Sequence, residues 1–557
     1  MSIINTHVMK FYCLSLILFS QLTWLSGNAQ SRTGVSNPVV NTESGRIQGT
    51  STNPGGIYVY RGIPYAQPPV GALRWKAPQP VQAWDTILKA DRFGPRAMQG
   101  NVFGDMNFRS NGMSEDCLYL NIWAPAEPSK PKRPVLVYFY GGGMVAGDGS
   151  EGRYDGESMA RKGIVSLTVN YRLGVFGLLA HPELSKEAPY HASGNYTLLD
   201  QQAALAWVKK NIAAFGGDPD RITIAGESAG SISVSALMAS PLSKDLINGA
   251  IGESGAMIFP TMPPASKEDA EKNGIAFANA IGAGSLEALR AIPAEELLKR
   301  ASGPGMPPLS ANIDGYVLPK KPAEIFAAGE QAQVPLLVGW NSAELPYRAL
   351  LWKDDPTPEN YVRKIKELYP QDAEEALRLY PGNTREEVIA SATDLASDRF
   401  IVYSTWKWAA LQKSTSQQPV YRYVFSHSRP PMTPKMGNAQ PGLAGGVIRT
   451  SATQPAKPKP AKTFKGAPHA AEIEYALGNL RLNTVYAWTK EDYQVSNTML
   501  NYFANFIKTG NPNGGSLPKW EADAVTNSRY MNIDLRSSLK QEKHGDRYLF
   551  LDKAYKQ

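Results

Sequence analysis

Short apolar runs alternate with longer amphipathic stretches along most of this chain. Turn-forming residues bound the runs, so we expect β-strands at 135–140, 163–170, 222–225, 246–252, 334–339 and 420–425. The longer stretch 199–214 places its apolar residues on one helical face, which predicts a helix. Strands that alternate with helices predict an α/β fold with a large, mostly parallel central sheet and helices on both faces. In such sheets, functional sites lie at the carboxyl ends of the strands.

The first 29 residues follow a different pattern. Lys10 is their only formal charge, an apolar run follows at 11–19, and small residues at 27–29 suit a cleavage site. The apolar core is too short for a membrane span. We therefore expect a signal peptide at 1–29, export to the periplasm or the exterior, and no stable membrane insertion. A retained membrane anchor is the alternative.

Composition restricts the remaining 30–557, which we expect to form a single domain because no low-complexity linker divides the chain before about residue 426. Lys and Arg number 58 against 50 Asp and Glu, a net charge of +8 that is not gathered into long runs. We therefore expect no nucleic-acid partner. Of the 2 cysteines, Cys13 leaves with the signal peptide and Cys117 stays, so no intrachain disulfide can form. The histidines and Cys117 lack metal-ligand spacing and no phosphate-binding loop occurs, so we expect no metal and no cofactor.

Residues 226–230 read G-E-S-A-G and connect a strand pattern to a run of small residues. This order fits a nucleophile elbow, the sharp strand-to-helix turn of the motif G-x-S-x-G. Glu227 and Ala229 occupy the variable positions. The flanking glycines give the backbone freedom that the turn needs. The sequence therefore predicts Ser228 as a nucleophile, and the alternative is a glycine-rich turn.

A serine nucleophile needs a base, and the base needs an acid that holds its tautomer. His427, His469 and His544 follow Ser228 in the sequence. His469 is the strongest candidate, because it follows the loop sequence G-A-P and precedes a helical pattern at 470–480. His427 enters a polar, proline-rich stretch and His544 lies in a charged turn. A capped surface histidine is the alternative for His469.

The acid is sought just beyond the carboxyl end of a strand. Glu344 follows the strand predicted at 334–339, whereas Asp314 precedes a glycine in a pairing that is equally a simple turn. We expect Glu344 to be the acid, with a dipole-stabilised carboxylate at a helix start as the alternative. The glycines at 141–143 follow a buried strand, and their backbone N–H groups, with that of Ala229, suit an oxyanion hole.

With these pieces placed, the chain resembles the type B carboxylesterase family, which includes cholinesterases, bacterial para-nitrobenzyl-type esterases and some lipases. The similar segments are 60–66, 115–121, 170–174 and 215–219, which read YRGIPYA, EDCLYLN, NYRLG and FGGDP, and the resemblance covers nearly the whole mature chain. It implies the α/β-hydrolase fold. It also implies that Ser228 is the nucleophile, Glu344 the acid and His469 the base, with Gly142, Gly143 and Ala229 as the oxyanion hole and Ser254 as a supporting serine near the acid.

Three departures from the family pattern bear on the substrate. Ala97 stands where the family usually has a cysteine that pairs with the one at Cys117. The loop between them lacks the tryptophan with which cholinesterases hold a quaternary ammonium, which argues against a choline ester. Phe103 and Phe108 are candidates for a pocket or for simple packing. A Pro- and Lys-rich insertion at 426–465 is either a solvated loop or a gate at the mouth of the site.

The sequence thus predicts an exported serine carboxylesterase that hydrolyses small-molecule esters through an acyl-enzyme. Two alternatives are a lipase acting on longer-chain esters and a non-catalytic, neuroligin-like binding protein. The complete set of Ser228, Glu344 and His469 favours catalysis over the binding protein. The polar insertion, which is not a long amphipathic lid, favours short esters over lipids. The acyl and alcohol groups of the substrate and the oligomeric state stay open.

Overall fold

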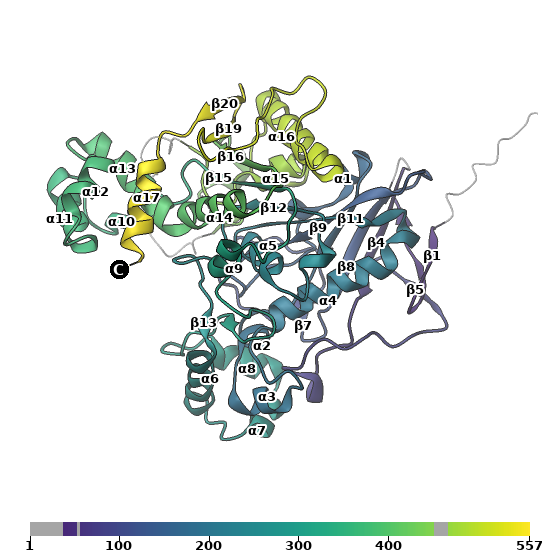
Figure 1. The fold of residues 1–557 in the computed structure, drawn as a ribbon. Coiled ribbons are helices and arrows are strands. Elements are labelled where there is room, and N and C mark those ends of the chain that lie inside the picture. The colour runs from purple at the N-terminus through teal and green to yellow at the C-terminus, as the bar shows by residue number, and fades with distance from the viewer. Residues whose placement is uncertain (1–36, 53–55, 450–465, 557) are drawn as a thin grey trace, which may run out of the picture. The chain divides into compact units, whose positions relative to one another are not determined.

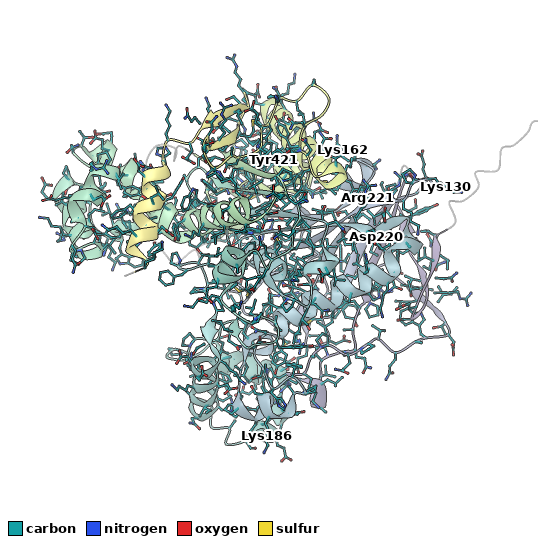
Figure 2. The ribbon with its side chains drawn as sticks, in the orientation of Figure 1. Lys130, Lys162, Lys186, Asp220, Arg221 and Tyr421 are labelled. Atoms are coloured by element: carbon teal, nitrogen blue, oxygen red, sulfur yellow. The ribbon has the colours of Figure 1, made fainter. Side chains whose placement is uncertain are left out.

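The computed structural model describes residues 37–52, 56–449 and 466–556, whose fold is shown in Figure 1. The signal peptide predicted at 1–29 lies outside the described residues. So does the 450–465 part of the insertion, with Lys457, Lys459, Lys462 and Lys465. Within the described ranges, no helix is both long and apolar enough to cross a membrane. Among the side chains labelled in Figure 2, Lys130, Lys186 and Asp220 are exposed.

An eleven-stranded sheet in the order β20-β19-β16-β15-β12-β11-β9-β10-β8-β4-β3 forms the centre of the fold. The strands from β19 to β10 in this order run parallel, whereas β20 and the group β8, β4 and β3 are antiparallel. The predicted mostly parallel sheet is therefore confirmed. Its strands are β3 (Thr50–Ser51), β4 (Ile57–Pro64), β8 (Tyr119–Pro125), β9 (Arg133–Phe139), β10 (Val165–Val169), β11 (Gly217–Glu227), β12 (Gly249–Glu253), β15 (Leu336–Asn341), β16 (Val420–Phe425), β19 (Arg529–Ile533) and β20 (Ser538–Gln541).

The other strands form small sheets outside the central one. They are β1 (Val39–Thr42), β2 (Gly45–Gln48), β5 (Ile87–Lys89), β6 (Arg96–Ala97), β7 (Met113–Ser114), β13 (Ala265–Ser266), β14 (Asn312–Ile313), β17 (Gln440–Pro441) and β18 (Val447–Ile448).

Helices cover both faces of the central sheet (Figure 1). On one face α4, α5 and α14 pack against the parallel strands, and on the other lie α1 and α16. The α-helices are α1 (Glu157–Arg161), α2 (Gly174–Leu178), α3 (Pro182–Glu187), α4 (Tyr196–Asn211), α5 (Ala229–Ala239), α6 (Lys267–Ala280), α7 (Leu286–Ala291), α8 (Ala294–Ala301), α9 (Pro322–Ala328), α10 (Arg348–Leu351), α11 (Pro358–Leu368), α12 (Ala373–Leu379), α13 (Arg385–Ser397), α14 (Tyr403–Thr415), α15 (Ile473–Ala476), α16 (Lys490–Thr509) and α17 (Gly545–Ala554).

Short turns of other helix types complete the fold. The 3-10 turns are η1 (Gly71–Leu73), η2 (Gly152–Tyr154), η3 (Ile212–Phe215), η4 (Lys244–Leu246), η6 (Pro434–Met436) and η7 (Leu480–Leu482). The segment η5 (Asp398–Val402) is a π-helical turn that joins α13 to α14.

The central strands agree closely with those predicted from the sequence, because both of their faces are buried. β9, for example, is almost continuously buried and has an unbroken apolar run at 135–139, whereas β10 is equally buried but carries Ser166 and Thr168 between its apolar residues. Two predicted segments need correction. The strand at 246–252 begins only at Gly249, because η4 precedes it. The helix at 470–480 is wrong: Ala470 has a left-handed φ of 61°, and only the short α15 and η7 follow.

The parallel register brings three strand ends to one edge of the sheet. Glu227 at the end of β11 is opposite Glu253 at the end of β12, which is opposite Gly339 in β15. Ser228, Ser254 and Glu344 each follow one of these strands by one to three residues. The sheet therefore gathers the residues selected from the sequence at its carboxyl edge, as expected.

Candidate active site

Ser228 occupies a sharp turn between β11 and α5. Its backbone has φ 54° and ψ −120°, a conformation that residues other than glycine rarely adopt. A Cβ on Gly230 would clash with the carbonyl oxygen of Phe139, so only glycine lets α5 approach β9 this closely. The strained turn and its glycine are the geometry expected of a nucleophile elbow.

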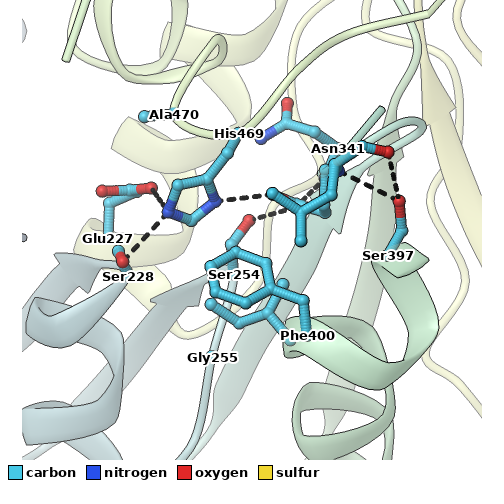
Figure 3. A network of polar contacts seen from close by, with 12 residues as sticks. Glu227, Ser228, Ser254, Gly255, Asn341, Ser397, Phe400, His469 and Ala470 are labelled. Atoms are coloured by element: carbon cyan, nitrogen blue, oxygen red, sulfur yellow. Dashed lines mark hydrogen bonds and ion pairs between the residues drawn. The ribbon is translucent and has the colours of Figure 1, made fainter. Parts of the chain in front are cut away.

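His469 connects Ser228 to Glu344. Its Nε2 lies 3.0 Å from Ser228 Oγ, and its Nδ1 lies 2.6 Å from Glu344 Oε2. Figure 3 shows the His469 ring between Ser228 and the end of β15. Glu344 is 0 % and His469 7 % exposed, so solvent has little access to this chain of contacts. The structure therefore brings together the serine, histidine and carboxylate that the sequence selected.

Glu344 is held on its second oxygen as well. Its Oε1 accepts hydrogen bonds from the Asn341 backbone N–H, at 2.6 Å, and from Ser254 Oγ, also at 2.6 Å. Ser254, which the resemblance placed near the acid, thus contacts the acid directly. With both oxygens engaged, the carboxylate has one orientation toward His469.

The glycine loop after β9 lies against the elbow. A Cβ on Gly141 would be 3.2 Å from Ser228 Cβ. Gly142 has φ 122° and Gly143 has φ 65°, values that favour glycine. Ala229 is fully buried at the first position of α5. The glycine loop and the start of α5 thus both adjoin the serine, where the sequence predicts the N–H groups of an oxyanion hole.

Glu227 and Glu472 are buried carboxylates that the sequence reasoning missed. Glu227 was treated as a variable position of the motif, yet its Oε1 lies 3.3 Å from His469 Nε2 (Figure 3). Glu472 accepts a hydrogen bond from Asn341 Nδ2 at 2.5 Å and one from Ser254 Oγ at 3.3 Å. Two signals in the sequence could have identified them. Glu227 is a charged residue at the end of a buried strand, and Glu472 is a charged residue three positions after His469.

Burial and mutual repulsion shape the ionisation of this group. Burial raises the pKa of Glu227 to about 6, although the neighbouring His469 opposes the shift. Burial, then Glu227 and Glu344, raise the pKa of Glu472 to about 8. For His469, burial acts to lower the pKa, but Glu227 and Glu344 outweigh it and raise the pKa to about 9. The site therefore stabilises the protonated imidazole that forms when the histidine takes a proton.

The rival candidates are held in other contacts. His427 bonds Asp492 at 2.8 Å and Asp534 at 3.2 Å. Asp314 accepts hydrogen bonds from the backbone N–H groups of three following residues, so it closes a turn. His544 is exposed at the N-terminal end of α17, and its backbone N–H donates to Glu542 Oε1 at 2.8 Å. Each of them has a structural explanation that does not involve Ser228.

The structure also shows the surroundings of the loop between Ala97 and Cys117. Both residues are buried, and Cys117 is a free cysteine. Phe103 and Phe108 line a cavity of about 630 Å³ together with side chains of α8, so these aromatics do form a pocket wall. In the part of the chain that the structure describes, no cluster of His, Cys, Asp or Glu side chains is arranged to hold a metal ion.

Comparison with known proteins identifies the chain's relatives. Residues 36–551 match the profile of the carboxylesterase family. Fumonisin B1 esterase of Sphingopyxis macrogoltabida is 34% identical over 512 residues, which cover 86% of this chain and 84% of that protein. Para-nitrobenzyl esterase of Bacillus subtilis (strain 168) is 35% identical over 493 residues, covering 85% of this chain and 90% of that protein.

Solved structures agree with this result. A para-nitrobenzyl (PNB) esterase structure is 32% identical with a TM-score of 0.71, and covers 92% of this chain and 99% of that chain. A carboxylesterase of Geobacillus stearothermophilus is 31% identical with a TM-score of 0.73 and the same coverage, 92% and 99%. The predicted α/β-hydrolase fold and the likeness to bacterial para-nitrobenzyl-type esterases are therefore confirmed.

Proposed function

Because this chain belongs to the carboxylesterase family and is a carboxylic ester hydrolase, we propose that it is an exported serine esterase that cleaves small-molecule esters through an acyl-enzyme. The observation that carries this proposal is the pair of contacts at His469, 3.0 Å to Ser228 Oγ and 2.6 Å to Glu344 Oε2. Both distances are within hydrogen-bond reach, so a proton can pass from the serine to the histidine as the nucleophile attacks.

The proposed reaction has two halves. Ser228 Oγ attacks the ester carbonyl while its proton moves to His469 Nε2, and the negative oxygen that forms accepts hydrogen bonds from the N–H groups of Gly142, Gly143 and Ala229. His469 then gives the proton to the leaving alcohol, and the acyl group stays on Ser228. In the second half, water loses a proton to His469, attacks the acyl carbonyl and releases the acid. Glu344 stays ionised and stabilises the imidazolium.

Replacement of Ser228 tests this proposal. The mature protein should hydrolyse para-nitrophenyl esters, with short acyl chains preferred over long ones, and Ser228→Ala should lose at least about 10³-fold in kcat with its thermal unfolding unchanged. A burst of para-nitrophenol in the unmodified protein would report the acyl-enzyme. Full turnover in Ser228→Ala would contradict the proposal, and a preference for long acyl chains would favour the lipase alternative.

Export is the second part of the proposal, and it rests on the charge and apolar pattern of residues 1–29. Expression of the full chain in a bacterium that secretes through the general pathway should yield an enzyme outside the cytoplasm. Its N-terminus, read by sequencing, should lie close to residue 30. A product that sediments with membranes and begins at Met1 would instead support the retained anchor.

A further inference from the structure

A polar cavity of about 410 Å³ lies beside the glycine loop, and we call it the insertion cavity. The segment 104–107, η2, and the described part of the insertion from Met436 to Arg449 form its walls, together with Glu474 and residues 482–485. This volume is within the range of about 300–1,000 Å³ typical of small-molecule sites. The insertion that departs from the family pattern therefore builds one wall of a cavity.

Specific contacts hold that wall in place. The Gly446 backbone N–H donates to Asp105 Oδ2 at 3.1 Å, and Asn483 Nδ2 donates to the Gly445 carbonyl at 3.0 Å. Closer to the catalytic histidine, Arg429 Nη2 donates to Glu474 Oε2 at 2.7 Å. These hydrogen bonds connect the described part of the insertion to the loop 97–117 and to α15, so the cavity is a built part of the fold.

Two buried polar atoms of the cavity walls lack aligned partners. Asp105 is 3 % exposed, and its Oδ1 has no hydrogen-bond partner among the described residues. Arg153 is 7 % exposed, and its Nε lies 3.2 Å from Glu151 Oε2 but without the alignment of a hydrogen bond. Buried polar groups are rarely left without partners, because each costs about 1–3 kcal/mol. Asp105 thus offers a free acceptor on one wall, and Arg153, whose Nε and Nη2 both face Glu151, offers its remaining guanidinium N–H groups on the other.

The charges around the cavity balance. Asp105, Glu151 and Glu474 supply carboxylates, and Arg153 and Arg449 line the same space, with Arg449 on the exposed rim. Arg429 adds a third positive charge through its ion pair with Glu474. With no net excess of either sign, neither an anion nor a cation is selected. A hydroxyl group, which both donates and accepts, suits the free carboxylate oxygen of Asp105 and the guanidinium N–H groups of Arg153 that do not face Glu151.

Two of the lining residues place the cavity near the residues of the proposed reaction. Met106, which lines it, comes within 3.1 Å of a Cβ placed on Gly142. Glu474, on the opposite wall, follows His469 by five residues and lies in α15. In the proposed reaction His469 gives its proton to the leaving alcohol, so that alcohol lies on the histidine side of Ser228.

We propose that the insertion cavity binds the leaving alcohol of the substrate and that this alcohol is a neutral polyol, such as a sugar. Asp105 Oδ1 accepts a hydrogen bond from one hydroxyl, and the Arg153 guanidinium donates to another. This inference rests on the proposed function, since it names the substrate class of the same site.

The test compares two esters that differ only in their hydroxyl groups. Glucose 6-acetate and cyclohexylmethyl acetate share the acyl group and a six-membered ring, so their kcat/KM ratio isolates recognition of the hydroxyls. We expect the mature enzyme to prefer the sugar ester by at least about tenfold, the value of one well-placed hydrogen bond. Asp105→Asn keeps the size and the contact with Gly446, and it should reduce this preference about tenfold, chiefly through KM.

Ser428→Ala is the matched control. Ser428 bonds Gly466 at 3.2 Å and so fastens the insertion, but it does not line the cavity, and its substitution should leave the preference unchanged. A measurement without variants supports the same point: free glucose should inhibit the enzyme competitively, and cyclohexylmethanol should inhibit more weakly.

Three outcomes would overturn the inference. The first is an equal kcat/KM for the two esters. The second is a folded Asp105→Asn variant that loses kcat/KM equally for both esters. The third is a preference for 4-aminomethylcyclohexylmethyl acetate over the sugar ester that Asp105→Asn abolishes. The last result would make the cavity a cation site. Para-nitrophenyl acetate separates this failure from that of the proposed function, because its alcohol carries no additional hydroxyl. If the enzyme hydrolyses para-nitrophenyl acetate but does not prefer the sugar ester, the proposed esterase function stands and only the inference of a polyol alcohol is refuted.

Discussion

Glu227 is the charged group that most directly sets the ionisation of His469. It lies 3.3 Å from Nε2, and with Glu344 it raises the histidine pKa to about 9 against the effect of burial. In the proposed reaction only the neutral imidazole can accept the serine proton, so kcat/KM should fall as the pH falls through this pKa. In Glu227→Gln the negative charge is gone, the pKa of His469 drops toward its ordinary value, and the acidic limb of the profile should move down by about one pH unit.

The measurement is kcat/KM for a para-nitrophenyl ester from pH 5 to 10, corrected for spontaneous hydrolysis. Glu253→Gln is the control: Glu253 is equally buried, but Tyr138 donates to it at 3.0 Å and it does not contact His469. Its substitution should leave the acidic limb in place. An unmoved limb in Glu227→Gln would mean that Glu227 does not control the histidine.

Single residues also show what could be inferred before the structure. Ser228 and Glu344 were found because each follows a strand at the edge where parallel strands end, and His469 because few histidines follow the serine. Glu227 was not predicted as a site residue, because the motif G-x-S-x-G treats its position as variable although the fold buries it. Glu472 was not predicted as a site residue, because the position of its side chain depends on the left-handed backbone of Ala470, which no helical pattern predicts.

At the scale of elements, the π-helical turn η5 and its flanking residues hold the backbone around the site. Ser397 Oγ accepts a hydrogen bond from the N–H of Leu345, next to the acid, at 3.1 Å (Figure 3). Thr405 Oγ1 accepts one from the N–H of Gly255, next to Ser254, at 2.8 Å. The Phe400 ring meets the His469 ring edge-on, with centroids 5.1 Å apart. Such π-turns occur frequently at functional sites.

Thr405→Val tests this positioning role, because it removes the acceptor while keeping the shape. We expect kcat to fall about tenfold with little change in KM, since displacement of the Ser254 backbone disturbs Glu344 and leaves the substrate contacts intact. Thr415→Val, on the same helix and bonded to Phe326 and Leu411, should lose similar stability but keep its kcat. Equal kcat values for the two variants would leave Thr405 a purely structural residue.

The start of α16 shows how one carboxylate stabilises an element. Asp492 caps the helix with Thr489 and also bonds Tyr475 at 2.7 Å and His427 at 2.8 Å. Burial would raise its pKa, but these hydrogen bonds outweigh burial and lower the pKa to about 2. The folded value lies below the unfolded value of about 3.9, so the stabilisation is present above pH 4 and is lost as the pH falls from 4 to 2.

Asp492→Asn should therefore lower the free energy of unfolding by about 2 kcal/mol at pH 7, measured by urea titration. Its stability should also fall less steeply between pH 4 and pH 2 than that of the unmodified protein. The control is Asp546→Asn, which removes an exposed carboxylate from the first turn of α17. The explanation fails when both variants show the same pH dependence.

At the scale of the whole molecule, the sequence predicted the middle of the sheet better than its edges. β9, β11 and β15 lie between two layers of helices, so short, mostly apolar runs identify them, with Thr223 as the polar residue within the run of β11. β4 and β8 were not predicted, although they form the antiparallel side. β4 has an irregular register between Tyr60 and Ile63, and the middle of β8 carries Asn121, which is polar but satisfied by Thr168 at 3.0 Å. A buried polar residue with a distant partner breaks a local pattern without breaking the strand.

The opposite side of the sheet depends on a buried ion cluster. Arg422 on β16 is 1 % exposed and donates to Asp523 at 2.9 Å, to Glu542 at 2.9 Å and to Ser528 at 2.8 Å. These partners lie before β19 and after β20, so one guanidinium fastens the last two strands to the rest of the sheet. Asp523→Asn should cost about 3 kcal/mol, because it leaves part of a buried positive charge unpaired.

A double-mutant cycle separates this interaction from general damage. If Arg422 and Asp523 act as a pair, Arg422→Met combined with Asp523→Asn should destabilise the protein less than the sum of the two single changes, with a coupling of about 1–3 kcal/mol in urea unfolding. The exposed pair Lys320 and Glu330, 2.8 Å apart, should show less than about 1 kcal/mol in the same experiment. Additive effects at Arg422 and Asp523 would instead show that packing alone holds β19 and β20 on the sheet.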